Sequence, residues 1–270
     1  DSNPSSPLHP GNNLGTTWTA SSTDDLARTR TGVQVFTATN DTQIVTAGAP
    51  ELNSTVGTFA FWMRTTDFLN PTPGAGNEAA MFMDRRSSDG TVITMGIGGE
   101  VFVQCAGGAN TLSDFSYLPD GNWHHVAVTY DQSLPGGIEI FVDGFSTASQ
   151  TNTTAWSWPA TQPIELGRSH DGYWYRYDGG MDDFRFYDRI LTPTEIAAIV
   201  SSDALVDAGA LKLRYNFDTA GIGWTVQYPF GTLESTPTLN PPDWQPVPGA
   251  TPPNYPTPAL DPAQFFRATP

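Results

Sequence analysis

The chain has 270 residues, enough for one large β-sandwich and a smaller second unit. A formal net charge of −16 repels DNA, RNA and anionic membranes, so we expect no nucleic-acid partner, and no apolar run is long enough for a membrane span. Abundant Gly and Pro (26 and 23 residues), with recurrent Val, Thr and Phe, are typical of many short strands and turns and predict an all-β fold.

Residues 1–15 are rich in Pro, Asn, Ser and Gly and are predicted to be an irregular lead-in. Alternation of apolar and polar residues then predicts a series of short strands. In chain order these are Thr31–Thr39, Gln43–Thr46, Phe59–Arg64, Ala80–Asp84, Val92–Ile97, Glu100–Gln104, His125–Tyr130, Ile138–Val142, Ile164–Gly167 and Met181–Tyr187, with Gly98-Gly99 as a hairpin turn. Strands of this number and spacing predict a sandwich of two sheets.

One short helix is predicted at Pro193–Val200. Thr192 is the expected N-cap, proline occupies the first helical position, and Glu195 completes a capping box. A change in composition after this helix divides the chain into a main domain, 16–203, and a small proline-rich β unit, 204–270. The second unit is expected to be fibronectin-III-like, with polyproline segments between its strands. The alternative is that Lys212–Phe217 adds an edge strand to the main sandwich.

Two segments carry a resemblance to a known family. Residues 120–144 read DGNWHHVAVTYDQSLPGGIEIFVDG, and residues 179–196 read GGMDDFRFYDRILTPTEI. They resemble the laminin-G-like, or concanavalin A-like, lectin-glucanase jelly roll, which commonly reads WHHVAVTYD, then VYVDG, then GIDDVRIY. The resemblance extends over Thr31–Ser201 and includes bacterial secreted proteins. It implies a two-sheet antiparallel jelly-roll sandwich closed by the short helix.

The family includes lectins, adhesion modules, enzymes and scaffolds, so the fold does not name a function. Glucanases of this fold need closely spaced carboxylates on one face of a strand. Here Glu139 and Asp143 lie on the same face, but Phe141 stands between them where the family needs a carboxylate. We therefore predict that the chain is not an enzyme.

The resemblance also implies a calcium site on the outer face of the sandwich. Asp182 matches the position that supplies a side-chain ligand, and Asn40 and Asp41 match the turn of the first hairpin. The preceding residues, Phe36-Thr37-Ala38, lack the aspartate often found there. The alternative is that Asp182 caps a turn and Asp183 pairs with Arg185 or Arg189.

A ligand site is predicted in the aromatic segment HDGYWYRY and the preceding AWSWPA. Sugar rings stack on Trp and Tyr, and Asp and Arg bind hydroxyl groups. The candidate ligand-binding residues are Trp156, Trp158, His170, Asp171, Tyr173, Trp174, Tyr175 and Arg176. The alternatives are internal packing, which the two-residue spacing of Trp156 and Trp158 favours, and contact with another chain.

These observations predict a non-catalytic recognition module that binds polysaccharide or a cell-surface protein. One alternative is a structural subunit of a surface layer or extracellular filament, formed by self-association. A second is an accessory domain of a secreted carbohydrate-active enzyme. The chain begins at Asp1 rather than Met, as after removal of a secretion signal. With the resemblance, this predicts a secreted or cell-surface protein.

Overall fold

The computed structural model places the larger part of the chain. The residues it describes are 11–26, 28–38, 42–66, 80–85, 91–96, 98–158, 161–168, 175–204, 214–217, 223–227, 232–237, 241, 243–250, 254–258 and 265–269. Contacts within the chain define two compact units. The first consists of Asp1–Val142 and Ser146–Leu191, and the second consists of Asp143–Phe145 and Thr192–Pro270.

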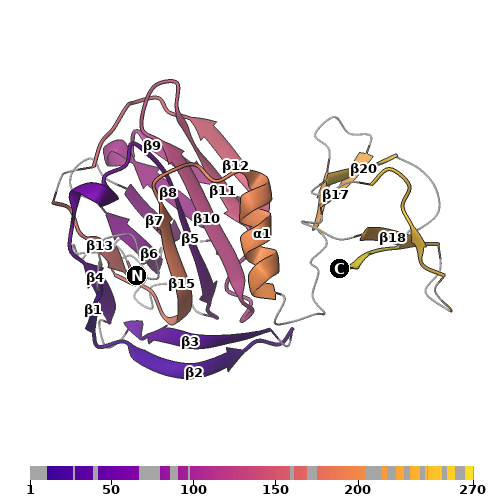
Figure 1. The fold of residues 1–270 in the computed structure, drawn as a ribbon, viewed down its shortest axis with the longest axis horizontal. Coiled ribbons are helices and arrows are strands. Elements are labelled where there is room, and N and C mark those ends of the chain that lie inside the picture. Colours follow the sequence, from indigo (N-terminus) through magenta and orange to yellow (C-terminus); the bar gives the residue numbers. More distant parts are fainter. Residues whose placement is uncertain are drawn as a thin grey trace. The chain divides into compact units, whose positions relative to one another are not determined.

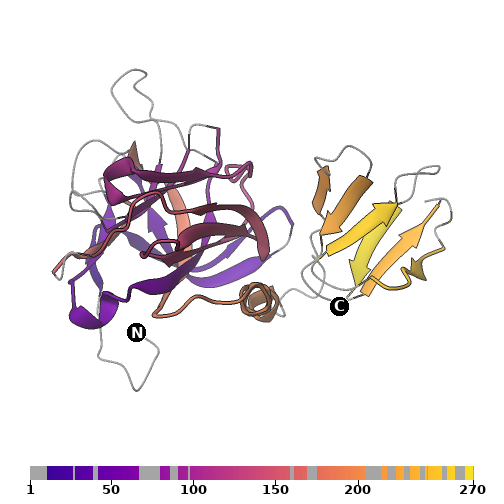
Figure 2. The same ribbon diagram turned by 90° about the horizontal axis from the view of Figure 1, so that it is seen from above.

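The first unit is a sandwich of two sheets (Figures 1 and 2). One sheet has the order β1 (Gly11–Leu14), β4 (Gln43–Thr46), β13 (Ile164–Leu166), β6 (Ala80–Arg85), β7 (Thr91–Met95), β8 (Val101–Cys105) and β9 (Asn110–Ser113), and the two-residue β14 (Tyr175–Arg176) pairs in parallel with β6. The other has the order β12 (Phe145–Thr151), β11 (Gly137–Val142), β10 (His124–Asp131), β5 (Val56–Arg64), β15 (Gly179–Tyr187), β3 (Thr29–Phe36) and β2 (Thr17–Thr23). Short 3-10 turns follow β4 and β8, at Pro50–Leu52 and Ala106–Gly108.

The predicted all-β, two-sheet antiparallel sandwich is therefore confirmed, apart from the parallel β14. The lead-in differs from the prediction, because Gly11–Leu14 is a strand whose register on β4 runs from Gly11↔Thr46 to Leu14↔Gln43. Its sequence, GNNL, has little strand propensity, but a sheet edge pairs through backbone groups that every such residue has.

The hydrophobic core lies between the two sheets. In the β10–β5 ladder Val126 faces Phe61 and Val128 faces Phe59, and all four side chains are buried. Phe82, Ile93 and Val103 of the other sheet belong to the same cluster. Burying such a side chain contributes roughly 1.5–3 kcal/mol, so the period-2 pattern of β5 and β10 fixes the register of both strands.

The helix of the second unit is α1 (Pro193–Ala204). The predicted capping box is present: Glu195 N–H donates to Thr192 Oγ1 (3.2 Å) and Thr192 N–H donates to Glu195 Oε2 (2.8 Å). Two three-stranded sheets follow: β16 (Arg214–Phe217), β17 (Gly223–Gln227) and β20 (Asn254–Pro258), then β19 (Gln245–Pro246), β18 (Thr232–Thr236) and β21 (Phe265–Thr269).

The proline-rich stretch of this unit contains two short strands, β19 and β20. The polyproline segments predicted between strands stay a prediction. β19 and β20 each lie at the edge of their sheet and pair with one neighbouring strand. Proline is tolerated there because the missing N–H can be on the side of the strand that has no partner. The boundary was predicted after the helix, between residues 203 and 204, whereas the contacts group α1 with the second unit. The fibronectin-III-like character of this unit stays a prediction.

Candidate functional site

Trp156 and Trp158 lie in the hydrophobic core. Each is 7% exposed, and their rings meet edge to face with centroids 4.8 Å apart. Trp158 Nε1 donates a hydrogen bond to the Ser54 carbonyl (3.1 Å). Neither indole presents a face to solvent, so the prediction that they stack on a sugar is corrected. Their two-residue spacing does place both side chains on one side, and that side is the core.

Arg85 is buried beside these rings. Its guanidinium carbon lies 4.4 Å from the centroid of the Trp158 ring, and its nitrogens donate to the Leu52 carbonyl and to Asn53 Oδ1. Burial lowers the pKa of Arg85 to about 10, with a smaller opposing effect of Tyr130, so the side chain is protonated at neutral pH. Through its hydrogen bond to Leu52 and its cation–π contact with Trp158, Arg85 connects the 3-10 turn at Pro50–Leu52 to the core, and it is buried away from any ligand.

Two residues of the predicted aromatic segment are described, Tyr175 and Arg176. They form β14, both side chains are half-buried, and Tyr175 packs against the core. The next residue, Tyr177, is fully buried, and its hydroxyl lies within hydrogen-bond distance of the Arg64 and Gly180 carbonyls (2.9 and 2.7 Å). The remaining candidates, His170, Asp171, Tyr173 and Trp174, lie outside the described residues. A ligand site in this segment therefore stays a prediction.

The carboxylate of Asp182 is held by an arginine. It accepts a hydrogen bond from Arg30 Nε (2.9 Å), and the Arg30 guanidinium carbon lies 4.7 Å from the centroid of the Trp62 ring. Asp183 pairs with Arg185, whose Nε donates to Oδ1 at 2.8 Å. The alternative pairing predicted for Asp183 is thus present, whereas Asp182 is an ion-pair partner and not a turn cap.

Calcium binds about six to eight oxygen ligands and is repelled by nearby cations. The guanidinium of Arg30 lies 2.9 Å from Asp182 Oδ2, so a cation bound to this carboxylate would meet a positive charge. Within the described ranges no three His, Cys, Asp or Glu side chains come together as a metal site. Asn40 and Asp41 lie outside those ranges. The calcium site stays a prediction, and Asp182 as hydrogen-bonded here does not fit it.

The strand examined for catalytic carboxylates is β11. Glu139 is half-buried and accepts a hydrogen bond from Ser146 Oγ (2.5 Å), and Phe141 is buried. Asp143 lies beyond the end of the strand, in a turn with φ of +53° and 4% exposure. The strand therefore carries one accessible carboxylate, not the pair that glycoside hydrolysis requires.

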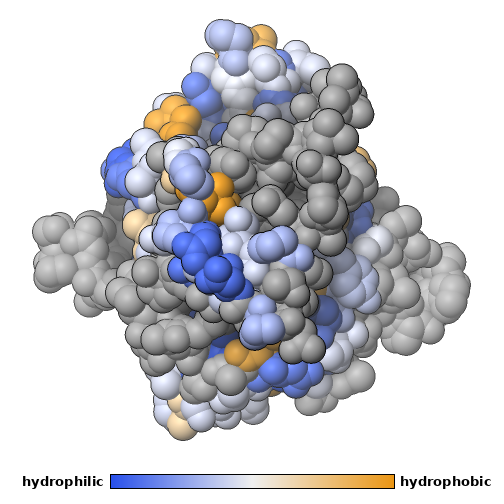
Figure 3. Space-filling model, turned by 90° about the vertical axis from the view of Figure 1, so that its right-hand side faces the viewer, coloured by the Kyte–Doolittle hydropathy of each residue, from blue (hydrophilic) through white to orange (hydrophobic). Residues whose placement is uncertain are grey.

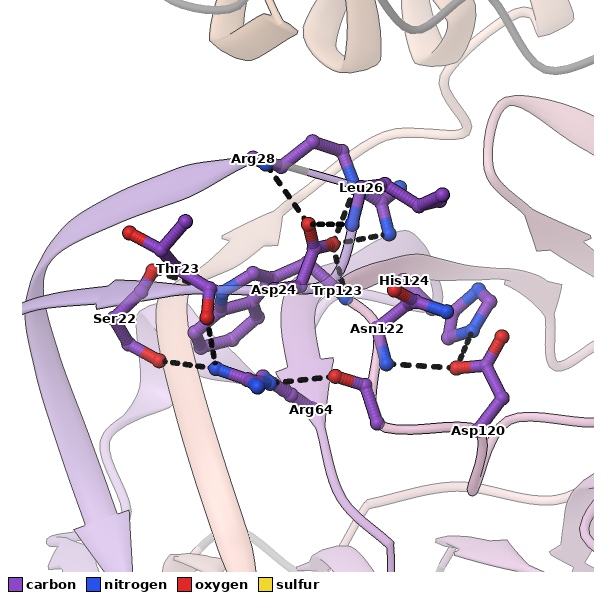
Figure 4. A network of polar contacts seen from close by, with 11 residues as sticks. Ser22, Thr23, Asp24, Leu26, Arg28, Arg64, Asp120, Asn122, Trp123 and His124 are labelled. Carbon is purple, nitrogen blue, oxygen red and sulfur yellow. Dashed lines mark hydrogen bonds and ion pairs between the residues drawn. The ribbon is translucent and has the colours of Figure 1, made fainter.

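A polar network joins the β2–β3 turn to the segment before β10 (Figure 4). Asp24 is 5% exposed and accepts hydrogen bonds from the backbone N–H groups of Leu26 (3.0 Å), Arg28 (2.8 Å) and Trp123 (2.9 Å), and from Arg28 Nε (2.6 Å). Burial alone would raise the pKa of Asp24, but these bonds and the Arg28 charge outweigh it and lower the pKa. Asp24 is a fixed anion that holds two loops together.

The same network contains a histidine–carboxylate pair. His124 Nε2 lies 3.0 Å from Asp120 Oδ1, which also accepts the Asn122 N–H (2.8 Å). Burial alone would raise the pKa of Asp120. The hydrogen bonds from His124 and Asn122 have the larger opposite effect, so the pKa lies well below its usual range. Close to this pair the Gly121 carbonyl accepts a hydrogen bond from Arg64 Nε (2.6 Å), and Arg64 also donates to Ser22 Oγ (3.0 Å) (Figure 4). The pair orders the start of β10.

Exposed aromatic side chains mark a different part of the sandwich. Phe115 is 100% exposed and Tyr117 is 58% exposed, both in the loop after β9, and Trp18 on β2 is 63% exposed. On the face shown in Figure 3, hydrophobic residues appear as separate spots among hydrophilic ones. Phe115 and Tyr117 are not among the ligand-binding residues predicted from the sequence. Their signal was an aromatic pair in a segment of turn residues, SDFSYLPDG, with no strand alternation around it.

Comparison with known proteins identifies the family. A family model described as "Concanavalin A-like lectin/glucanases superfamily" matches residues 38–197, more than half of the chain. This chain belongs to the concanavalin A-like lectin/glucanase superfamily. The fold, the match and the two motif segments agree, so the predicted family is confirmed. None of the helices in the described ranges has the length and apolar character needed to cross a bilayer.

Two curated relatives are similar over part of their length. The rat (Rattus norvegicus) protein "Sushi, von Willebrand factor type A, EGF and pentraxin domain-containing protein 1" is 23% identical over 152 residues, which are 54% of this chain and 4% of the relative. Neuronal pentraxin-2 of Cavia porcellus is 30% identical over 97 residues, 32% of this chain and 21% of the relative. This chain therefore spans only a small fraction of these relatives.

Two solved structures share the fold. The binding domain of Paraclostridial Mosquitocidal Protein 1 superposes with a TM-score of 0.57 and 11% identity, over 81% of this chain and 59% of that one. Domain 4 of AbnA, an extracellular GH43 arabinanase from Geobacillus stearothermophilus solved with arabinotriose, has a TM-score of 0.52 and 17% identity, over 71% of this chain and 88% of that one. At such identities the likeness concerns the fold alone.

Proposed function

We propose that this chain is a non-catalytic extracellular module that binds polysaccharide. The observation that carries the proposal is a lectin/glucanase sandwich in which the strand suited to a catalytic pair does not hold one. Glu139 is the single carboxylate on the outer side of β11, next to the buried Phe141, and Asp143 lies beyond the strand in a turn. A fold of this family without that pair retains its capacity for recognition.

The neighbouring structures support recognition as the function. One is described as a binding domain of a mosquitocidal protein, and another is domain 4 of an extracellular arabinanase in complex with arabinotriose. The second favours a specific version of the proposal, in which the chain is an accessory module of a secreted carbohydrate-active enzyme. In that role it would hold a catalytic domain on its polysaccharide substrate.

The proposal is tested by binding of the full chain to insoluble arabinan, xylan and cellulose, measured as depletion of protein from solution, with and without a calcium chelator. Release of reducing ends is followed in the same samples. We expect retention on at least one polysaccharide and no release. Retention on none of them, or release that is lost in Glu139→Gln, would contradict the proposal. The heat-unfolded chain is the control for adsorption without a folded site.

A further inference from the structure

The loop between β9 and β10 presents two aromatic side chains to solvent. Phe115 is 100% exposed and Tyr117 is 58% exposed, whereas the flanking Asp114 and Leu118 are buried. Exposing a phenyl ring completely forgoes the roughly 1.5–3 kcal/mol that its burial would contribute to folding. Within residues 114–117 the charged side chain of Asp114 is buried and the two aromatic side chains are exposed, which is the reverse of the usual arrangement.

The loop is held in place by Asp114. Its Oδ1 accepts the N–H groups of Val101 (2.9 Å) and Ser116 (3.1 Å), and its Oδ2 accepts the hydroxyls of Ser116 (2.6 Å) and of Thr147 on β12 (2.8 Å). Asp114 N–H donates to the Val101 carbonyl (3.1 Å), and Leu118 N–H donates to the Gly99 carbonyl (2.9 Å). The aromatic residues therefore project from a loop that contacts both sheets. Because the loop is already ordered, binding a ligand there loses little conformational entropy.

Tyr117 and Glu100 border the same turn between β7 and β8. An ideal Cβ on Gly99 would lie 3.0 Å from Tyr117 Cδ2, and one on Gly98 would lie 2.7 Å from Glu100 Oε2. The ring and the carboxylate thus use the space that these two glycines leave open. Glu100 is half-buried and lies 3.4 Å from Ser113 Oγ. A ring face with carboxylate and hydroxyl groups nearby suits a ligand that has C–H faces and hydroxyl donors.

Charge restricts the kind of sugar. Between Arg86 and Arg168 the sequence contains no Lys or Arg, but it contains eight Asp or Glu residues. This stretch supplies β7 to β13, the loop and both neighbouring sheet edges. An acidic glycan would meet carboxylates with no arginine or lysine from this stretch to bind its anionic groups.

We infer that Phe115 and Tyr117 form an aromatic platform for the rings of a neutral polysaccharide, with Glu100 accepting hydrogen bonds from sugar hydroxyls. This inference rests on the proposed function and adds the site and the ligand class. It places the binding surface at the β9–β12 edge of the sandwich, away from the HDGYWYRY segment singled out by the sequence.

The test uses the full chain and its variants on neutral arabinan, xylan and cellulose and on acidic polygalacturonate and heparin. Phe115→Ala and Tyr117→Ala remove each ring, Phe115→Leu keeps the apolar side chain without a ring, and Phe115→Tyr restores the ring. Trp18→Ala is the matched control, an exposed aromatic residue on β2, at the opposite edge of its sheet from β12. An unchanged unfolding midpoint for each variant shows that the fold is intact.

We expect binding to at least one neutral polysaccharide and none to the acidic ones. The association constant should fall about tenfold or more in Phe115→Ala, Phe115→Leu and Tyr117→Ala, the loss typical of an aromatic anchor, and stay near wild type in Phe115→Tyr and Trp18→Ala. Neutral binding that these alanine variants leave intact would overturn the platform and keep the proposed function. Preference for the acidic chains would overturn the ligand class, and no binding at all would overturn the proposed function itself. Concentration-dependent self-association lost in Phe115→Ala would make a second copy the partner and overturn the inference.

Discussion

Two loops of the sandwich are each held by a buried aspartate, and they differ in the aromatic residue that they carry. Asp24 fixes the segment before β10, and there Trp123 is 0% exposed and donates Nε1–H to the Ser22 carbonyl (3.2 Å). Asp114 fixes the loop after β9, and there Phe115 is 100% exposed. A buried, hydrogen-bonded aspartate therefore accompanies a buried aromatic side chain in one loop and an exposed aromatic side chain in the other. The difference separates a group that stabilises the fold from one that is available to a ligand.

The largest expected effect is on the two aromatic residues. Trp123→Ala should lower the free energy of unfolding by about 3–5 kcal/mol, as for a core aromatic, whereas Phe115→Ala should change it by less than about 0.5 kcal/mol. Urea denaturation followed by circular dichroism measures both. A loss of more than about 2 kcal/mol in Phe115→Ala would mean that this ring packs on the protein, and the contrast between the loops would disappear.

The second effect separates the two aspartates. Asp24 is paired with the Arg28 guanidinium, so Asp24→Asn leaves a buried cation and should cost about 3 kcal/mol. The groups that donate hydrogen bonds to Asp114 are backbone N–H and hydroxyl groups, which are neutral, so Asp114→Asn should cost about 1–2 kcal/mol. The exposed Asp188→Asn is the control, with no more than about 0.5 kcal/mol expected. Equal costs for Asp24 and Asp114 would show that the ion pair adds nothing to the first anchor.

Acid should weaken the Asp24 network in a defined direction. The pKa values of Asp24 and Asp120 are lowered in the folded state, so their contribution is complete above the ordinary carboxylate pKa and is lost as the pH falls through the folded values. We expect the unfolding free energy to decline below about pH 4, and to decline less steeply in Asp24→Asn. Parallel pH profiles for wild type and Asp24→Asn would contradict this account of the anchor.

The smallest expected effect concerns Asp182, a third aspartate with an arginine partner. Asp182→Asn should lower stability by about 1 kcal/mol, because it weakens a largely shielded pair with Arg30. If Asp182 pairs with Arg30 and binds no calcium, the loss of stability in Asp182→Asn is the same in calcium and in chelator. If the family calcium site is present, the melting temperature of the wild type rises with calcium and that of Asp182→Asn does not. Differential scanning calorimetry in both solutions decides between the two.

The sequence predicts the central strands well and the edges poorly. β5 and β10 were predicted because they are central strands that are buried on both faces, and the large apolar residues of each recur every second position toward the core. β2, β9 and β12 were not predicted. They lie at sheet edges and their side chains are mostly exposed or half-buried, so Ser and Thr can occupy both faces without a period. The helix was predicted because its capping box is local and complete within four residues.

Site prediction was limited for a related reason. Residue type identifies what can stack on a sugar, but exposure depends on tertiary packing. Trp156 and Trp158 have the right chemistry and lie in the core, whereas Phe115 and Tyr117 lie in solvent. What exposes the latter pair is Asp114, whose partners Val101 and Thr147 are 13 and 33 residues away in sequence. Such long-range contacts cannot be read from one sequence without the fold.

The most direct test of the central claim is the change in two quantities caused by one substitution, Phe115→Ala: the association constant for the neutral polysaccharide that the wild-type chain binds, and the free energy of unfolding, measured on the same preparation. We predict that the association constant falls about tenfold or more and that the free energy of unfolding stays within about 0.5 kcal/mol of wild type. An unchanged association constant, or a loss of binding matched by a loss of stability, would contradict the claim that this exposed ring is a binding surface.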